Sequence, residues 1–259
     1  MRFSIKKALV SYCVHNYKTL RLVERALAKN RIDFKCVNRE MLTKNQIRNK
    51  DLIISVGGDG TFLRTAHLVD KTPVFVVSSD VNYNEAFYGR ATIKDFERKI
   101  KLILNGKSKI TKLPRLEARI NKKKVPMLAV NEVFVGSRHP YHTSRYILKV
   151  KGKSELQKSS GVLVTTRTGS SGWAKSAAKK KLSIPKTGFG FVVREPYIGR
   201  LTKSKLLLGS LSAKETLRIT SLNHQGVVVV DYSEKEFGFV DGDKLEVKVS
   251  KKPLNFVEF

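Results

Sequence analysis

The 259-residue chain changes its pattern of hydrophobic and polar positions near residue 107. Before that point, apolar runs of strand length alternate with segments in which apolar residues recur at helical spacing. Alternation of strands and helices with short connections is typical of an open, mostly parallel α/β domain with right-handed crossovers. We therefore predict strands at 8–14, 33–37, 52–56 and 73–77, and helices at 18–30, 61–69 and 93–104.

Beyond residue 107 the hydrophobic period is two, which indicates strands. We predict one short helix at 172–178 and strands at 115–120, 129–135, 146–150, 162–166, 190–193, 217–221, 227–230 and 245–249. The chain is therefore predicted to contain a Rossmann-like α/β domain at 1–107 and a β-rich domain at 108–259. The last segment of the second domain is expected to be able to pack back on the first.

Composition excludes several classes of protein. The hydrophobic fraction of 41% is enough for a core and too high for a disordered chain. No apolar run approaches the ~20 residues of a transmembrane helix. Two cysteines, Cys13 and Cys36, cannot build a disulfide framework, and we expect buried free thiols in a reducing, cytoplasmic compartment.

The chain is strongly basic, with 51 Lys and Arg against 22 Asp and Glu and a formal net charge of +29. This charge attracts polyanions such as nucleotides, nucleic acid or polyphosphate. Nucleic acid is not expected as the main partner, because the sequence contains no zinc-finger, RNP-type or KH-type motif.

A glycine loop, Gly57-Gly58-Asp59-Gly60, follows the nearly all-apolar run 52–56 and precedes a predicted helix. Glycines let the backbone approach a ligand closely, and free amides at a helix start favour phosphate. A carboxylate among such amides indicates a Mg²⁺ ligand or a base that takes a proton from an attacking hydroxyl. An ordinary Gly-Asp-Gly turn is the alternative, but it does not explain the strand, the double glycine and the helix around it.

Three further stretches carry candidate chemistry. Asn131-Glu132 places a polar pair in the apolar stretch 129–136, where a strand-edge pair facing water is the alternative. Residues 159–177, SSGVLVTTRTGSSGWAKSA, lead from a strand into a loop whose hydroxyls and amides can contact ribose, phosphate or amide groups, with a flexible Ser-rich turn as the alternative. The third stretch is 191–200, FVVREPYIGR.

Taken in this order, the four stretches resemble the NAD kinase family over nearly the whole chain. GGDGT alone is shared with diacylglycerol and sphingosine kinases and, more distantly, with phosphofructokinases. The Asn-Glu pair, the TPTGSTAY-type loop and the Pro-containing segment after it are lacking in lipid kinases. KSSG before the loop, the Trp within it and REP after it are similar to the archaeal and mitochondrial-type branch.

The resemblance implies transfer of a phosphoryl group from ATP, or from polyphosphate, to the 2′-hydroxyl of the adenosine ribose of NAD, giving NADP. It implies dependence on Mg²⁺ or another divalent cation and a homodimer or homotetramer. Asp59 is implied to orient and deprotonate the hydroxyl. The other implied contacts are Gly57, Gly58 and Gly60 near phosphate, Asn131 and Glu132 at the adenosine, Thr168 and Ser171 at adenine, and Gly172 and Ser176 at the nicotinamide half, with Trp173 where many members have Tyr.

Three departures from the family pattern concern substrate preference more than the reaction class. Arg167 stands where Pro is usual, Ser160 where many bacterial members have Asp, and Tyr232 where many have Gly after Asp231. Two alternative functions remain. A lipid or sugar kinase with a GGDGT loop would leave Asn131-Glu132 without a role, and a non-catalytic nucleotide or nucleic-acid binder would rely on the positive charge.

Overall fold

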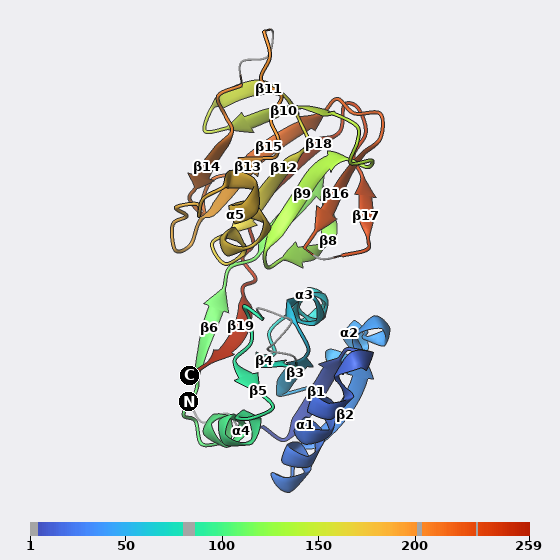
Figure 1. Ribbon diagram of the computed structural model, residues 1–259, viewed down its shortest axis with the longest axis vertical. Helices are drawn as coiled ribbons and strands as arrows, with labels where there is room; N and C mark the ends of the chain where they lie inside the picture. Colours follow the sequence, from blue (N-terminus) through green and yellow to red (C-terminus); the bar gives the residue numbers. More distant parts are fainter. Residues whose placement is uncertain (1–4, 80–85, 201–203, 232) are drawn as a thin grey trace. The chain divides into compact units, whose positions relative to one another are not determined.

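The computed structural model describes residues 5–79, 86–200, 204–231 and 233–259. The chain divides into two compact units, and each forms its own sheets (Figure 1). Unit 1 contains residues 1–113 and 253–259, and unit 2 contains residues 114–252. The predicted fold class is confirmed, because unit 1 is an α/β domain with a mostly parallel sheet and unit 2 is β-rich.

Unit 1 is built on one sheet with the strand order β2-β1-β3-β4-β19-β6, and β5 pairs with β4. Neighbours among β2, β1, β3 and β4 are parallel, and β3 and β4 are buried at every position because helices cover both faces. β19 is parallel to β4 and antiparallel to β6. The strands are β1 Lys7–Tyr12, β2 Asp33–Asn38, β3 Leu52–Val56, β4 Val74–Ser78, β5 Ala91–Thr92, β6 Lys109–Leu113 and β19 Leu254–Glu258.

Helices lie on both faces of this sheet. Apolar residues of α1 (Tyr17–Lys29) and α4 (Phe96–Leu104) share one buried cluster with alternate strand residues such as Val10 and Ile54. α3 (Asp59–Leu68) lies on the opposite face, where the Thr65 hydroxyl donates to Ser11 Oγ at 2.9 Å. The remaining short helices are η1 Val14–Asn16, η2 Arg39–Met41 and α2 Lys44–Ile47.

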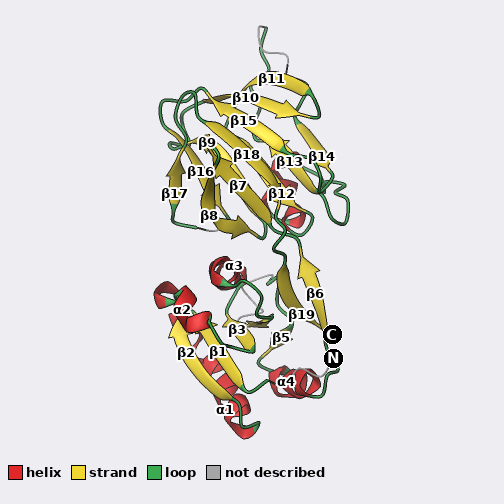
Figure 2. Cartoon of the chain, turned by 180° about the vertical axis from the view of Figure 1, so that it is seen from behind, coloured by secondary structure: helices red, strands yellow, loops and turns green. Residues whose placement is uncertain are grey.

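Unit 2 is a sandwich of two six-stranded sheets, with the orders β11-β10-β15-β18-β7-β8 and β14-β13-β12-β9-β16-β17 (Figure 2). Inward-facing residues of both sheets form one core cluster, and α5 (Trp173–Ala178) packs through Ala174 on the outer side of β12 and β13. The strands are β7 Leu116–Ile120, β8 Lys123–Ala129, β9 Glu132–Ser137, β10 Ser144–Val150, β11 Lys153–Ser159, β12 Val162–Thr166, β13 Phe189–Val193, β14 Leu208–Leu211, β15 Leu217–Ser221, β16 Gly226–Val230, β17 Glu236–Gly238 and β18 Lys244–Val249.

Several details differ from the sequence predictions. The predicted strand 129–135 is interrupted at its start, because β8 ends at Ala129 and β9 begins only at Glu132. Both cysteines are free, but Cys13 and Cys36 are partly exposed and not buried. The segment 109–113, which the pattern placed in the second domain, belongs to the sheet of unit 1, where it pairs as β6 with β19, the last segment that was expected to be able to pack back on the first domain. No described helix is long and apolar enough to span a membrane.

Candidate active site

The glycine loop of unit 1 connects β3 to α3 in a conformation that requires glycine. Gly57 has φ +152°, and a Cβ there would lie 2.5 Å from Thr61 Oγ1. Its amide donates to the Val77 carbonyl at 3.0 Å, which ties the loop to β4. α3 begins at Asp59 with Gly58 as its N-cap, and no side chain caps it. Because the first amides of a helix have no intrahelical acceptor, this end of α3 favours an anion.

The Asp59 carboxylate is held by two backbone amides from the segment after β4. Phe87 N–H donates to Oδ2 and Tyr88 N–H donates to Oδ1, each at 3.1 Å. The Tyr88 ring is buried and lies 4.3 Å from the Phe62 ring of α3, centroid to centroid. One amide on each oxygen restricts rotation of the carboxylate, and each oxygen keeps a lone pair for another donor. Asp59 lies in the first turn of α3, although the sequence pattern placed the helix start at residue 61.

Two arginines that the sequence did not single out lie at the first turns of α3, Arg39 beside the helix and Arg64 within it. Arg39 donates to Thr61 Oγ1 at 3.1 Å and pairs with Glu40 at 3.0 Å. Glu40 also forms an ion pair with Arg64. Arg39 follows β2 and has no motif around it, so only the parallel pairing of β2 and β1 could have indicated that it reaches the first turn of α3.

In unit 2, one carboxylate fixes the backbone of the Asn131-Glu132 pair. Asp231 Oδ1 accepts the amides of Asn131 at 2.8 Å and Glu132 at 2.9 Å, and Oδ2 accepts the amide of Val130 at 2.7 Å. The Asp231 amide in turn donates to the Glu132 carbonyl at 2.8 Å. Asp231 has φ +48°, a conformation that is uncommon for a residue other than glycine. The pair therefore lies in a fixed break between β8 and β9.

The loop after β12 packs directly on Asn131. The Thr166 hydroxyl donates to the Val130 carbonyl at 2.7 Å, and the Thr166 amide donates to the Asn131 carbonyl at 2.8 Å. A Cβ on Gly169 would lie 2.5 Å from the Asn131 carbonyl oxygen, so a larger residue would displace Asn131. Two of the predicted motifs are thus joined into one cluster inside unit 2.

The remaining predicted residues lie on η3 (Gly169–Ser171) and α5. The Ser171 hydroxyl donates to the Thr168 carbonyl at 3.0 Å. The Trp173 indole stacks on Phe134 with ring centroids 5.4 Å apart, and the Arg194 guanidinium carbon lies 4.8 Å from the indole centroid. Exposed members of this group are Gly172, Trp173 and Ser176.

The departures from the family pattern have different surroundings. The Ser160 amide donates to the Arg194 carbonyl at 3.0 Å. Ser160 therefore lies just before β12 and is bonded to the residue whose guanidinium lies over Trp173. Arg167 is exposed and belongs to the turn that follows β12. Tyr232 lies outside the described residues.

Glu132 is the most unusual titratable group of unit 2. It is 9% exposed, and its Oε2 is buried without a hydrogen-bond partner among the described residues. Burial, and then the nearby charge of Asp231, raise the pKa of Glu132 from 4.5 to about 8. Because buried polar atoms are nearly always hydrogen-bonded, this oxygen indicates a place where a ligand supplies the missing partner.

The raised pKa of Glu132 predicts a pH-dependent stability. The folded chain keeps this proton between about pH 4.5 and 8, where the unfolded chain releases it, so stability falls as pH rises through that window. The limiting slope is about 1.4 kcal/mol per pH unit. Glu132→Gln should flatten the slope in urea unfolding measured at pH 5 and pH 8, whereas Glu246→Gln, at an exposed ion pair, should leave it unchanged. An equal slope in wild type and Glu132→Gln would contradict this assignment.

The predicted site residues thus form two clusters, and each lies within one unit. The loop cluster of unit 1 contains Gly57, Gly58, Asp59 and Gly60, and the cluster of unit 2 contains Asn131, Glu132, Thr168, Ser171, Gly172, Trp173 and Ser176. Within the described part of the chain, no three His, Cys, Asp or Glu side chains converge on a point where they could hold a metal ion.

Comparison with known proteins shows similarity to NAD kinases. Residues 7–108 match the model of the ATP-NAD kinase N-terminal domain. The chain is 28% identical over 257 residues to a probable NADH kinase of Oryza sativa subsp. japonica, which covers 91% of this chain and 79% of the relative. It is 25% identical over 226 residues to an NAD kinase of Thermoplasma acidophilum, with 87% and 79% covered.

The fold is also found in a solved structure. The crystal structure of an NAD kinase from Archaeoglobus fulgidus in complex with ATP superposes with a TM-score of 0.78, at 24% identity, over 96% of this chain and 92% of that one. This likeness extends across the α/β unit and the β-rich unit alike. Residues 7–108 thus match the NAD kinase model, and the chain as a whole is similar in sequence to NAD and NADH kinases and in fold to an NAD kinase.

Proposed function

We propose that this protein transfers the γ-phosphoryl group of ATP to the 2′-hydroxyl of the adenosine ribose of NAD, giving NADP, with Asp59 as the general base. The observation that carries the proposal is the position of Asp59. Its carboxylate lies in the first turn of α3, directly after a buried parallel strand, and is held there by the amides of Phe87 and Tyr88. A fixed carboxylate among phosphate-binding amides suits deprotonation of a hydroxyl beside a phosphate.

The step conserves atoms and charge as follows. The ribose oxygen forms a bond to the γ-phosphorus while the bond from that phosphorus to the β–γ bridging oxygen breaks, and ADP leaves with the electron pair. The hydroxyl proton passes to an Asp59 oxygen. A secondary hydroxyl has a pKa far above 7, so a positioned base lowers the barrier by removing this proton as the bond forms. The amides at the start of α3 offset the phosphate charge.

The cluster of unit 2 supplies the proposed acceptor contacts. Below about pH 8 the buried Glu132 carboxyl is protonated and can donate a hydrogen bond as well as accept one. Its unpartnered Oε2 supports a role in binding the adenosine part together with Asn131. Thr168 and Ser171 are proposed at adenine, and Gly172, Trp173 and Ser176, which are exposed, near the nicotinamide half.

A divalent cation fits this arrangement even though no three protein ligands converge. Mg²⁺ at phosphoryl-transfer sites is usually held by one or two carboxylates together with substrate phosphates. Asp59 could serve as such a ligand, because both of its oxygens keep a lone pair. When bound, the cation neutralises charge on the donor phosphates.

The test is NADP formation by the purified wild-type protein, measured by enzymatic cycling specific for NADP. With ATP, Mg²⁺ and NAD we expect product, and none with an NAD analogue that lacks the 2′-hydroxyl of the adenosine ribose. Parallel reactions with polyphosphate as donor and NADH as acceptor establish substrate preference. EDTA should abolish turnover. Light scattering should give a homodimer or homotetramer.

The alternatives predict other outcomes of the same assay. A lipid or sugar kinase would consume ATP only with those acceptors and leave NAD unchanged. A non-catalytic binder would retain nucleotide or nucleic acid without turnover. No NADP from any combination of ATP or polyphosphate with NAD or NADH would overturn the proposed function.

A further inference from the structure

The segment that holds Asp59 is itself held by one arginine. Arg90 lies two residues after Tyr88, the second of the two residues whose amides bind the Asp59 carboxylate, and its guanidinium turns back toward them. Arg90 Nη1 donates to the Phe87 carbonyl at 3.1 Å and to the Gly89 carbonyl at 3.0 Å. Through these two bonds, segment 87–90 forms a small loop around the guanidinium group of Arg90.

One peptide group connects Arg90 to Asp59. The Phe87 carbonyl and the Tyr88 amide belong to the same peptide plane, so this plane accepts from Arg90 on one side and donates to Asp59 Oδ1 on the other. A cation on the carbonyl oxygen polarises the peptide and strengthens its N–H as a donor. The plane cannot rotate without breaking one of the two bonds. Arg90 therefore acts on the orientation of the carboxylate through one shared peptide.

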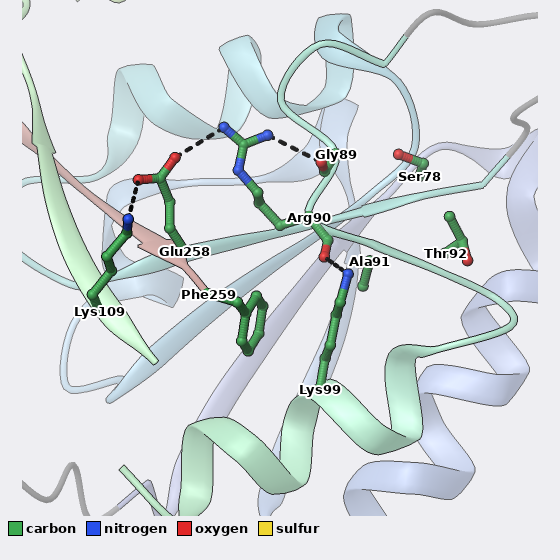
Figure 3. A pocket seen from close by; sticks show the side chains of 9 residues that line it. All are labelled: Ser78, Gly89, Arg90, Ala91, Thr92, Lys99, Lys109, Glu258 and Phe259. Atoms are coloured by element: carbon green, nitrogen blue, oxygen red, sulfur yellow. Dashed lines mark hydrogen bonds and ion pairs between the residues drawn. The ribbon is translucent and has the colours of Figure 1, made fainter. Parts of the chain in front are cut away.

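Arg90 is anchored at its other end by groups of the last strand. Nη2 pairs with Glu258 Oε1 at 3.0 Å (Figure 3). The guanidinium carbon also lies 4.9 Å from the Phe256 ring centroid. Glu258 Oε2 accepts from the Thr111 hydroxyl at 2.5 Å. The pKa of Glu258 is lowered by Thr111 first, and also by Arg90 and Lys109, so this carboxylate stays charged at neutral pH.

We propose that Arg90, anchored by Glu258, is a positioning residue that fixes the catalytic orientation of Asp59 through the Phe87–Tyr88 peptide. This inference rests on the proposed function, because it assigns a role relative to the general base. Arg90 contacts no reacting atom in the proposal. Its loss should therefore misorient the base and lower kcat, while substrate affinity stays nearly unchanged.

The central experiment compares Arg90→Ala with wild type in steady-state NADP formation. A small misplacement of a catalytic group can cost about 100-fold in rate, so we expect kcat to fall about 10- to 100-fold. KM for NAD and ATP should stay within about threefold, since the lost interaction acts only on turnover. Arg90→Lys keeps the charge but cannot hold two carbonyls and a carboxylate in one plane, so its kcat should be intermediate.

Chemical rescue separates positioning from general destabilisation. Arg90 lines a cavity of about 310 Å³ that also borders Lys99, Lys109 and Glu258, so a small cation can reach the vacated place (Figure 3). Guanidinium at millimolar concentration should restore part of kcat in Arg90→Ala and none in Asp59→Asn. Lys109→Gln is the matched control. It removes a cation 4.0 Å from Glu258 and leaves the Arg90 bonds to Phe87, Gly89 and Glu258 in place, so kcat should stay within about twofold of wild type.

The outcomes distinguish this inference from the proposed function. If Asp59→Asn is inactive and folded Arg90→Ala turns over like wild type, the positioning role is wrong and the proposed function stands. If Asp59→Asn keeps full activity, the general-base assignment fails, and the inference fails with it. If Arg90→Ala does not fold, Glu258→Gln decides, with a reduced kcat expected and a wild-type kcat overturning the inference. The double variant Asp59→Asn/Arg90→Ala should be no slower than Asp59→Asn alone.

Discussion

Replacing Asp59 by Asn is expected to lower kcat for NADP formation by about 10²- to 10⁴-fold, the range typical of a lost general base. The amide is nearly isosteric with the carboxylate but cannot accept a proton at neutral pH. It can still accept one of the two amides, from Phe87 or Tyr88, that hold the native side chain. Nucleotide affinity should therefore be largely kept, which isothermal titration with NAD and with ATP would measure separately from turnover.

A second aspartate in the same unit provides a matched control for this substitution. Asp51 Oδ2 accepts the backbone amides of Lys6 and Lys7, each at 2.8 Å, but Asp51 precedes β3 and lies at the opposite end of that strand from the glycine loop. Asp51→Asn therefore weakens the same kind of contact without touching the loop, and its kcat should stay near wild type. If both variants lose turnover equally, the effect of Asp59→Asn reflects loss of structure and not loss of a base.

The parts of the fold that could be predicted from sequence are those whose signal is local. β3 and α3 follow from a nearly all-apolar run that meets a glycine loop, because a strand covered on both faces has few polar positions to obscure it. β11, with the sequence KSELQKS, was missed because its buried positions, Gln157 and Ser159, are polar, so the sequence carries almost no apolar alternation. β19 was expected to be able to pack back on the first domain, but it is short and its partners β4 and β6 are far away in sequence, so no local pattern indicated which strands it pairs with.

The candidate site likewise combines residues that the sequence indicates with supporting contacts that only the structure shows. Asp59 and the Asn131-Glu132 pair stand out because a polar residue interrupts an apolar pattern. Their supports do not stand out, since Tyr88 lies 29 residues from Asp59 and Asp231 lies 100 residues from Asn131. A backbone amide carries no sequence signal, so the contribution of Phe87 and Tyr88 could only come from the structure. Asp231 was noticed as part of a motif, but its role as an acceptor of backbone amides could not be read from the motif.

Removing the Asp231 carboxylate is the second large effect that we expect. Asp231→Ala takes the acceptor away from the amides of Val130, Asn131 and Glu132 at once. Each buried donor left without an acceptor costs about 1–3 kcal/mol, so the free energy of unfolding should fall by roughly 3–5 kcal/mol. The substitution also leaves alanine at φ +48°, a conformation that aspartate and asparagine tolerate better.

Asp231→Asn should be milder and should affect substrate binding more than folding. The asparagine oxygen can still accept the two amides that Asp231 Oδ1 accepts now, while the Val130 amide would face an NH₂ group. Because Asn131 and Glu132 are the proposed adenosine contacts, KM for NAD should rise about tenfold, which corresponds to about 1.4 kcal/mol, and KM for ATP should change less. Steady-state kinetics at saturating levels of the other substrate would measure both values.

Asp243 gives the matched control, since its carboxylate also accepts a backbone amide, that of Val240 at 2.8 Å, together with the Asn121 side chain. Asp243 belongs to unit 2 but has no contact with the Asn131-Glu132 break, so Asp243→Asn should leave KM for NAD unchanged. If folded Asp231→Asn has an unchanged KM for NAD, the shape of the break does not affect acceptor binding, and the role of Asp231 is purely structural. A rise in KM confined to NAD would instead mean that the Asp231 carboxylate, 100 residues from Asn131 in sequence, holds the break between β8 and β9 in the shape that binds the acceptor.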